Sequence, residues 1–151
     1  MKTIKILIKN KYLKGFKVHT PDPGHLREQY NFINDNNLAS FDGFGKTLQF
    51  WTLQWGATAR HSCWSWFEPE VDNLFFNYMK EKNFSKAVNI INRESPIVKV
   101  IRMTGYPGYK YLMQLSGLPA SKSRIPGESL NLKVKITIKE AYKSLKKIII
   151  N

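Results

Sequence analysis

Alternating hydrophobic and polar positions at both ends of the chain predict two β-strands. Near the amino terminus, Ile4, Ile6 and Ile8 alternate with positions that include two lysines. From Leu130 to Ile138 every second residue is aliphatic. Successive side chains of a strand point to opposite faces, so this alternation is typical of a strand with one buried face. Both segments are therefore predicted to be strands of one sheet, with lysines on their other face.

More strands are predicted in the interior of the chain. Residues 12–20 form a short hydrophobic run, and residues 97–103 are rich in β-branched side chains. Two aromatic segments, 47–55 and 60–67, flank a short link that contains glycine, which is typical of an antiparallel hairpin. The prediction is a mainly antiparallel sheet of about five to six strands.

Helical periodicity predicts helices around this sheet. Asp22 followed by Pro23 is typical of a helix cap and a first helical residue. Residues 71–79 place apolar side chains at i, i+3, i+4, i+7 and i+8. Shorter helices are expected from Ser85, around 111–115 and from Lys139. With about three to five helices on an antiparallel sheet, the predicted fold class is α+β, and residues 1–151 are expected to form a single globular domain.

The charge of the chain changes this picture from a fold to a class of partner. The formal net charge is +13, and residues 1–17 hold six lysines and no acidic residue. Residues 122–151 hold eight basic and two acidic residues. If both ends lie in one sheet, their lysines form a basic face, which attracts polyanions. The sequence thus predicts a non-enzymatic nucleic-acid-binding protein, with RNA favoured over DNA as the partner.

The predicted contacts are of two kinds. Lysines of the two ends would bind phosphates without base preference, whereas Arg124 and tyrosines near a glycine-rich turn would stack on bases or grip a phosphate. A solvated strand face and a turn with packed tyrosines are the plainer interpretations of the same residues. The predicted nucleic-acid-binding residues are Lys2, Lys5, Lys9, Lys11, Lys14, Tyr106, Tyr109, Lys110, Lys122, Arg124, Lys133, Lys135, Lys139, Lys143, Lys146 and Lys147.

The four tryptophans leave two interpretations open. Trp51, Trp55, Trp64 and Trp66 lie within sixteen residues of one another. They could form a stacking platform or ligand pocket, or they could be core residues, and alternation along a strand favours the core. No metal or cofactor is predicted, because the chain has only three histidines and one cysteine, Cys63.

Two other functions are weaker expectations. The basic, motif-poor profile suits a phage- or mobile-element-type inhibitor that docks on a nucleic-acid-guided nuclease or another nucleoprotein complex. Alternatively, His19 and His25 could act as acid and base in a metal-independent ribonuclease. The single cysteine suits a cytoplasmic location, and no segment approaches the ~20 apolar residues of a membrane span. No membrane partner is therefore expected, and the oligomeric state is left open.

Overall fold

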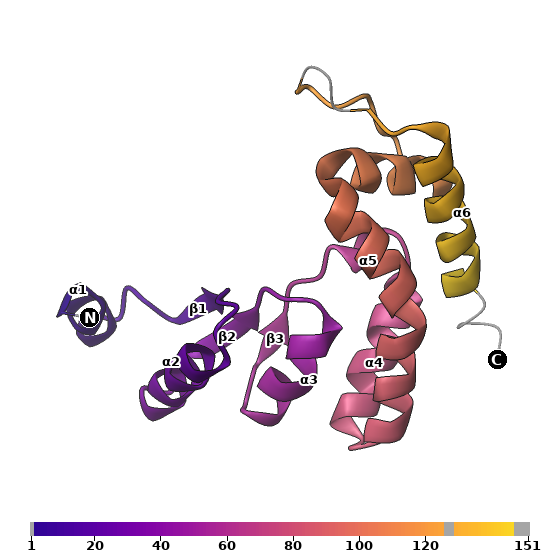
Figure 1. The fold of residues 1–151 in the computed structure, drawn as a ribbon. Helices are drawn as coiled ribbons and strands as arrows, with labels where there is room; N and C mark the ends of the chain where they lie inside the picture. The colour runs from indigo at the N-terminus through magenta and orange to yellow at the C-terminus, as the bar shows by residue number, and fades with distance from the viewer. Residues whose placement is uncertain (1, 126–128, 147–151) are drawn as a thin grey trace. The chain divides into compact units, whose positions relative to one another are not determined.

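Residues 2–125 and 129–146 are described by the computed structural model of this chain. The chain divides into two units, residues 1–62 and residues 63–151, and each is described by itself. Figure 1 shows them in different colours, the first from indigo to magenta and the second from magenta to yellow. Whether residues 1–151 act as a single domain stays a prediction.

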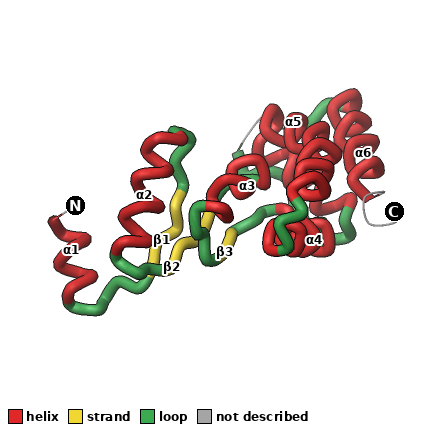
Figure 2. The backbone as a smooth tube through the Cα atoms, turned by 90° about the horizontal axis from the view of Figure 1, so that it is seen from below, coloured by secondary structure: helices red, strands yellow, loops and turns green. Residues whose placement is uncertain are grey.

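The first unit alternates helices with short strands. Its elements are α1 (Lys2–Lys9), β1 (Gly15–Val18), α2 (Pro23–Asp35), β2 (Ala39–Asp42), α3 (Lys46–Gln54) and β3 (Ala59–Arg60). The three strands form one parallel sheet in the order β1-β2-β3. Parallel neighbours need a crossover, and here α2 and α3 provide it. Both crossover helices lie along the sheet (Figure 2).

The sequence signals at the start of α2 act as predicted. The Asp22 carboxylate accepts a hydrogen bond from the His25 backbone N–H at 2.6 Å, and Pro23 begins the helix. The cap satisfies one of the amide groups that a helix start leaves without a partner. One stripe of the helix then packs against β1 and forms the hydrophobic core of this unit: Val18, Leu26, Tyr30 and Ile33.

The second unit is helical in its described residues. Its elements are η1 (Trp64–Trp66), α4 (Pro69–Lys80), α5 (Phe84–Leu115) and α6 (Leu132–Lys146). The helices α4, α5 and α6 pack alongside one another (Figure 1). The predicted helix over 71–79 is confirmed within α4. Its core includes the fully buried apolar residues Phe75, Ile97, Ile101, Leu112, Ile138 and Leu145.

The strand predicted over 97–103 is wrong, because this run is the middle of α5. Ile97 and Ile101, four residues apart, are fully buried, whereas Met103 is 78% exposed. That is the burial period of a helix, and β-branched residues tolerate a helix when packing rewards it. The helix also continues through Pro96 and kinks at Gly105, where φ is 57°.

The predictions of a strand at each end of the chain are also wrong, because both segments are helical. The residues of the first lie in α1, and those of the last fall mostly in α6. In α6 the buried residues Ile138, Tyr142 and Leu145 follow a helical stripe, while Leu132 and Ile136 are 74% and 53% exposed. Two of the five alternating aliphatic positions therefore face solvent, and the alternation did not indicate a buried strand face.

The aromatic hairpin is also wrong. Residues 47–55 lie mostly in α3, and residues 60–67 contain the end of β3 and η1. The sheet consequently has three parallel strands, so the predicted α+β class with a mainly antiparallel sheet of five to six strands is corrected to a mostly helical chain that contains a parallel sheet. Among the described residues, no helix is long and apolar enough to pass through a bilayer.

Candidate functional site at the carboxyl end of the sheet

One face of the parallel sheet is covered by helices and the other carries a lysine. Val18 points into the core beneath α2, and Phe16 packs against the same core. Alternation along β1 sends the Lys17 side chain to the opposite face, where it is exposed. Its partner in the register of β2 is Phe41, which is 47% exposed. The open face therefore combines an amine with an apolar surface.

Gly43, directly after β2, is the point where the site converges. A Cβ atom at this position would lie 2.9 Å from Lys17 Cε, 2.9 Å from His19 Nδ1 and 3.0 Å from the Val18 carbonyl oxygen. Only a residue without a side chain fits so close to its neighbours. Lys17 Cε and His19 Nδ1 both lie 2.9 Å from one point, so they are within 5.8 Å of each other.

The imidazole of His19 is held in a defined orientation. Its Nδ1 lies 3.1 Å from the Gly43 carbonyl oxygen, and its ring stacks on Phe44 with centroids 4.2 Å apart and planes 2° from parallel. A carbonyl oxygen can only accept a hydrogen bond, so Nδ1 is the donor. In the neutral ring this leaves Nε2 as the proton acceptor.

The loop that carries Gly43 and Phe44 is fixed from beneath by Asp42, which is 1% exposed. One oxygen of this carboxylate accepts a hydrogen bond from the Phe44 N–H at 2.6 Å, and the other accepts one from the Thr52 hydroxyl of α3. The backbone oxygen of Asp42 accepts a hydrogen bond from the His61 N–H at 2.7 Å. Asp42 thus connects the ends of β2 and β3 with helix α3.

Burial dominates the electrostatics of this support. It raises the pKa of Asp42, while the hydrogen bonds from Thr52 and Phe44 and the nearby His19 act in the opposite direction. Burial, followed by the proximity of Asp42, raises the pKa of Tyr30 to about 12. Both groups therefore favour their neutral forms more than they would in water, which is the expected effect of a poorly solvated interior.

A hollow of about 550 Å³ adjoins Lys17 and His19 between α1, β1 and α2. Its polar lining also includes His25 and Glu28 of α2, and Ile4 of α1 contributes to its apolar lining. Small-molecule sites commonly have volumes of roughly 300–1,000 Å³. The structure therefore brings both predicted histidines to one hollow. Sequence reasoning missed Lys17 as an individual, because it entered only as part of the terminal charge.

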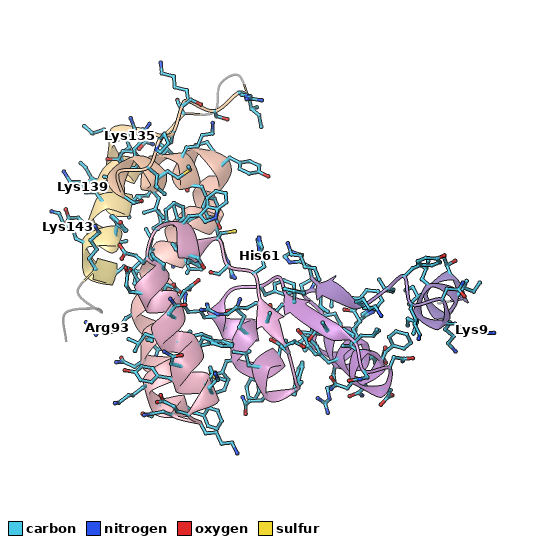
Figure 3. All side chains as sticks on the ribbon, turned by 180° about the vertical axis from the view of Figure 1, so that it is seen from behind. Lys9, His61, Arg93, Lys135, Lys139 and Lys143 are labelled. Atoms are coloured by element: carbon cyan, nitrogen blue, oxygen red, sulfur yellow. The ribbon has the colours of Figure 1, made fainter. Side chains whose placement is uncertain are left out.

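The residues predicted to bind nucleic acid divide between the two units. The lysines of the amino-terminal segment lie in α1 or in the connection to β1, and the other described members belong to α5, α6 and the loop between them. Figure 3 labels Lys9 on α1 and Lys135, Lys139 and Lys143 on α6. Lys147 lies outside the described residues. Because Lys5 and Lys133 lie in helices, the strand pairing proposed to unite the two sets is wrong.

Several of these residues contact their own chain. Lys110 Nζ donates a hydrogen bond to the Lys122 carbonyl oxygen at 2.9 Å, and Lys143 forms an ion pair of 3.0 Å with Glu140. Tyr109 is half-buried, and burial raises its pKa. By contrast, Tyr106 is 72% exposed. A ligand-binding role for this set stays a prediction.

The tryptophans divide between core and surface. Trp55 packs against the core of the first unit, with its ring centroid 6.2 Å from that of Tyr30, and Trp64 is 6% exposed. Trp51 and Trp66 are 51% and 66% exposed. Within the described part of the chain, His, Cys, Asp and Glu side chains form no group of three that could hold a metal ion.

Comparison with known proteins gives no sequence family but a clear structural likeness. No family model matches the chain, and no curated protein matches it. Among solved structures, the chain is similar to N-acetylneuraminate lyase from Fusobacterium nucleatum complexed with pyruvate, with a TM-score of 0.80 at 20% identity over 96% of this chain and 49% of that one. It is also similar to dihydrodipicolinate synthase from Bacillus clausii, with a TM-score of 0.79 at 16% identity over 96% of this chain and 51% of that one.

A third structure, N-acetylneuraminate lyase (sialic acid aldolase) from Aliivibrio salmonicida, matches with a TM-score of 0.75 at 19% identity over 93% of this chain and 48% of that one. The chain thus spans about half the length of the solved structures it matches. These proteins are barrels of alternating strands and helices, and what this chain shares with them is the fold.

This finding corrects the predicted function. The structures that share the fold are lyases and synthases of small molecules. They overturn the prediction of a non-enzymatic nucleic-acid binder together with its alternatives, the docking inhibitor and the ribonuclease. They equally overturn nucleic acid and a nucleoprotein complex as the expected partners. The misleading signal was net charge, which describes association and does not report the fold.

Proposed function

We propose that this chain contributes the amine nucleophile of an aldolase-type enzyme that acts on a small 2-oxo acid. Lys17 is the nucleophile, and its amine forms an imine with the ketone of a pyruvate-like substrate. The observation that carries the proposal is the convergence of Lys17 and His19 on Gly43 at the carboxyl end of a parallel strand. Active sites of strand–helix barrels are built at that end of the strands.

The chemistry of Lys17 suits this role. Lysine amines form Schiff bases with carbonyl substrates, and Lys17 forms no ion pair with a described carboxylate. Phe41 beside it in the register supplies an apolar surface for the substrate. One of the similar structures is named as a lyase complexed with pyruvate, which is a 2-oxo acid of the proposed class.

The rest of such a site would come from other polypeptide. A closed barrel of this kind has eight parallel strands, and this sheet has three. Additional strand–helix units would extend the sheet at its edges, enclose its open face and supply more of the substrate contacts. The substrate and the activity of a complete enzyme are therefore part of this proposal. A cytoplasmic location is also proposed, supported by the single cysteine.

Reductive trapping tests the role of Lys17 directly. The protein is incubated with pyruvate and sodium borohydride, which reduces an imine to a stable secondary amine, and the modified lysine is located by peptide mass spectrometry. We expect the adduct on Lys17 to predominate and to be absent from Lys17→Arg. Lys14→Arg is the matched control, because Lys14 is an exposed lysine three residues earlier that lies outside β1.

The alternative outcome is equally clear. Every exposed lysine amine reacts slowly with a ketone, so nonspecific labelling spreads over the many lysines of the chain. If Lys17 is labelled no more than Lys14, the proposed nucleophile is wrong. Gly43→Ala provides a second check, since its methyl group would displace the Lys17 side chain. It should reduce labelling of Lys17 and leave Lys14 unchanged.

A further inference from the structure

We propose that His19 is the proton-transfer residue that works beside Lys17. This inference rests on the proposed function and adds a specific step to it. Once Lys17 has formed an imine with a 2-oxo acid, His19 Nε2 removes a proton from the adjacent carbon, C3 of pyruvate. Gly43 and Phe44 fix the position and the tautomer of this imidazole.

The side chain of His19 lies close to that of Lys17. His19 follows Lys17 by two residues, so both side chains leave the same face of the chain at the end of β1. The 5.8 Å limit between Lys17 Cε and His19 Nδ1 places the imidazole within one small substrate of the amine. A proton-transfer group must lie close to the reacting atom, and C3 of pyruvate is bonded directly to the imine carbon.

The surroundings of His19 also fix the tautomer of its neutral ring. The hydrogen bond from Nδ1 to the Gly43 carbonyl oxygen commits the proton of a neutral ring to Nδ1. The lone pair is then on Nε2, which is the form that a general base requires. Stacking on Phe44 fixes the plane of the ring. Asp42 holds the Phe44 N–H and is therefore a positioning residue, because it acts on His19 through the loop.

The step balances without another reagent. The neutral Lys17 amine attacks C2 of pyruvate and, with one proton taken from solvent, water leaves, which gives a protonated imine. His19 Nε2 takes a proton from C3, and the electron pair of the broken C–H bond moves into the C2–C3 bond while the C=N electrons return to nitrogen. The product is an enamine, the carbon nucleophile that aldol chemistry needs. Return of a proton from His19 to C3 reverses the step.

Isotope exchange isolates this step from imine formation. The protein is incubated with pyruvate in D₂O, and loss of the methyl proton signal is followed by NMR, corrected for buffer alone. We compare the wild type with His19→Asn, because the asparagine amide can still donate to the Gly43 oxygen but has no basic nitrogen. Asp35→Asn is the control, since Asp35 is an exposed residue at the end of α2 and does not line the hollow.

We expect His19→Asn to lower the exchange rate by about 10²-fold or more and to retain borohydride trapping at Lys17. Asp35→Asn should retain both activities. Exchange at the wild-type rate in His19→Asn would overturn the inference, as would an equal loss in Asp35→Asn. Loss of both exchange and trapping in His19→Asn, repeated in a folded His19→Gln, would also overturn it, because His19 would then serve the amine. Failure to trap Lys17 in the wild type would instead remove the proposed function.

Discussion

The two units differ in the balance of apolar and polar side chains that they bury. The second unit packs apolar side chains between helices, as at Phe75, Ile101 and Leu145, all of which are fully buried. Among its described residues it buries only a few acidic side chains, those of Glu68, Asp72 and Glu94. The first unit has a small apolar core under β1, but between β2 and α3 it buries polar side chains. The most deeply buried of these are Ser40, Asp42, Lys46, Gln49 and Thr52. The opposite face of its sheet carries the exposed Phe41 and Lys17.

This difference separates support from chemistry. Apolar helix packing stabilises a structure without directing any particular reactive group. Buried polar groups cost desolvation unless they are hydrogen-bonded, and they are retained where geometry must be exact in direction and distance. In the first unit the hydrogen bonds of Asp42 fix the loop that orients His19. In this unit the buried polar groups therefore lie beneath the residues proposed to react.

The largest effect should come from the core of the second unit. Phe75→Ala removes a ring that is fully buried in α4 and leaves a cavity. We expect the free energy of unfolding to fall by about 3–5 kcal/mol, with faster hydrogen exchange in α4 and α5. Phe76→Ala is the control, because Phe76 is only partly buried on the same helix. Equal losses in the two variants would show that the core does not lie where the burial pattern places it.

A smaller effect should come from the sheet. A Cβ atom at Gly15 would lie 2.5 Å from the Ala39 carbonyl oxygen and 2.9 Å from the Ala39 Cβ, so Gly15→Ala forces β1 away from β2. We expect a loss of about 1–3 kcal/mol, seen in urea unfolding, and faster hydrogen exchange in the first unit alone. Gly45→Ala has open space at its Cβ and should change stability by no more than about 0.5 kcal/mol. Faster hydrogen exchange in the second unit as well would contradict the expectation that Gly15→Ala destabilises the first unit alone.

The smallest effect is a pH dependence. Burial raises the pKa of Asp42 above its ordinary 3.8, so the folded state keeps its proton at pH values where the unfolded chain has lost it. Stability from this group is complete below 3.8 and declines as pH rises through the raised pKa. Each unit of difference is worth about 1.4 kcal/mol. Asp42→Asn should flatten that decline in urea unfolding between acidic and neutral pH.

Asp35→Asn, at the exposed end of α2, is the control and should keep the wild-type slope. An Asp42→Asn profile parallel to that of the wild type would show that Asp42 is not titrating in a desolvated site. The same variant should loosen His19, so that pyruvate C3 exchange falls while Lys17 trapping persists.

The elements that could be predicted are those whose signals are local. The start of α2 follows from Asp22 and Pro23, and α4 follows from the apolar period of 71–79, since caps and helical stripes act within a few residues. The strand predicted over 12–20 is confirmed by β1. The two terminal strand predictions failed because lysine–isoleucine alternation also fits a helix whose aliphatic residues are partly exposed. Tertiary packing decides between the two. Ile136 and Ile138 would share one face of a strand, but in the structure Ile136 is exposed and Ile138 is buried.

The sequence by itself determined the cap of α2, helical segments within α2, α4, α5 and α6, the strand β1, the basic ends and the presence of His19 and His25. Only the tertiary structure decided which groups meet. Gly43 follows His19 by 24 residues, and their contact depends on parallel pairing of β1 with β2. Parallel pairing needs a crossover through α2, so no local pattern encodes it. This pairing forms the site, because it places Lys17 and His19 against Gly43, whose missing side chain allows both to approach.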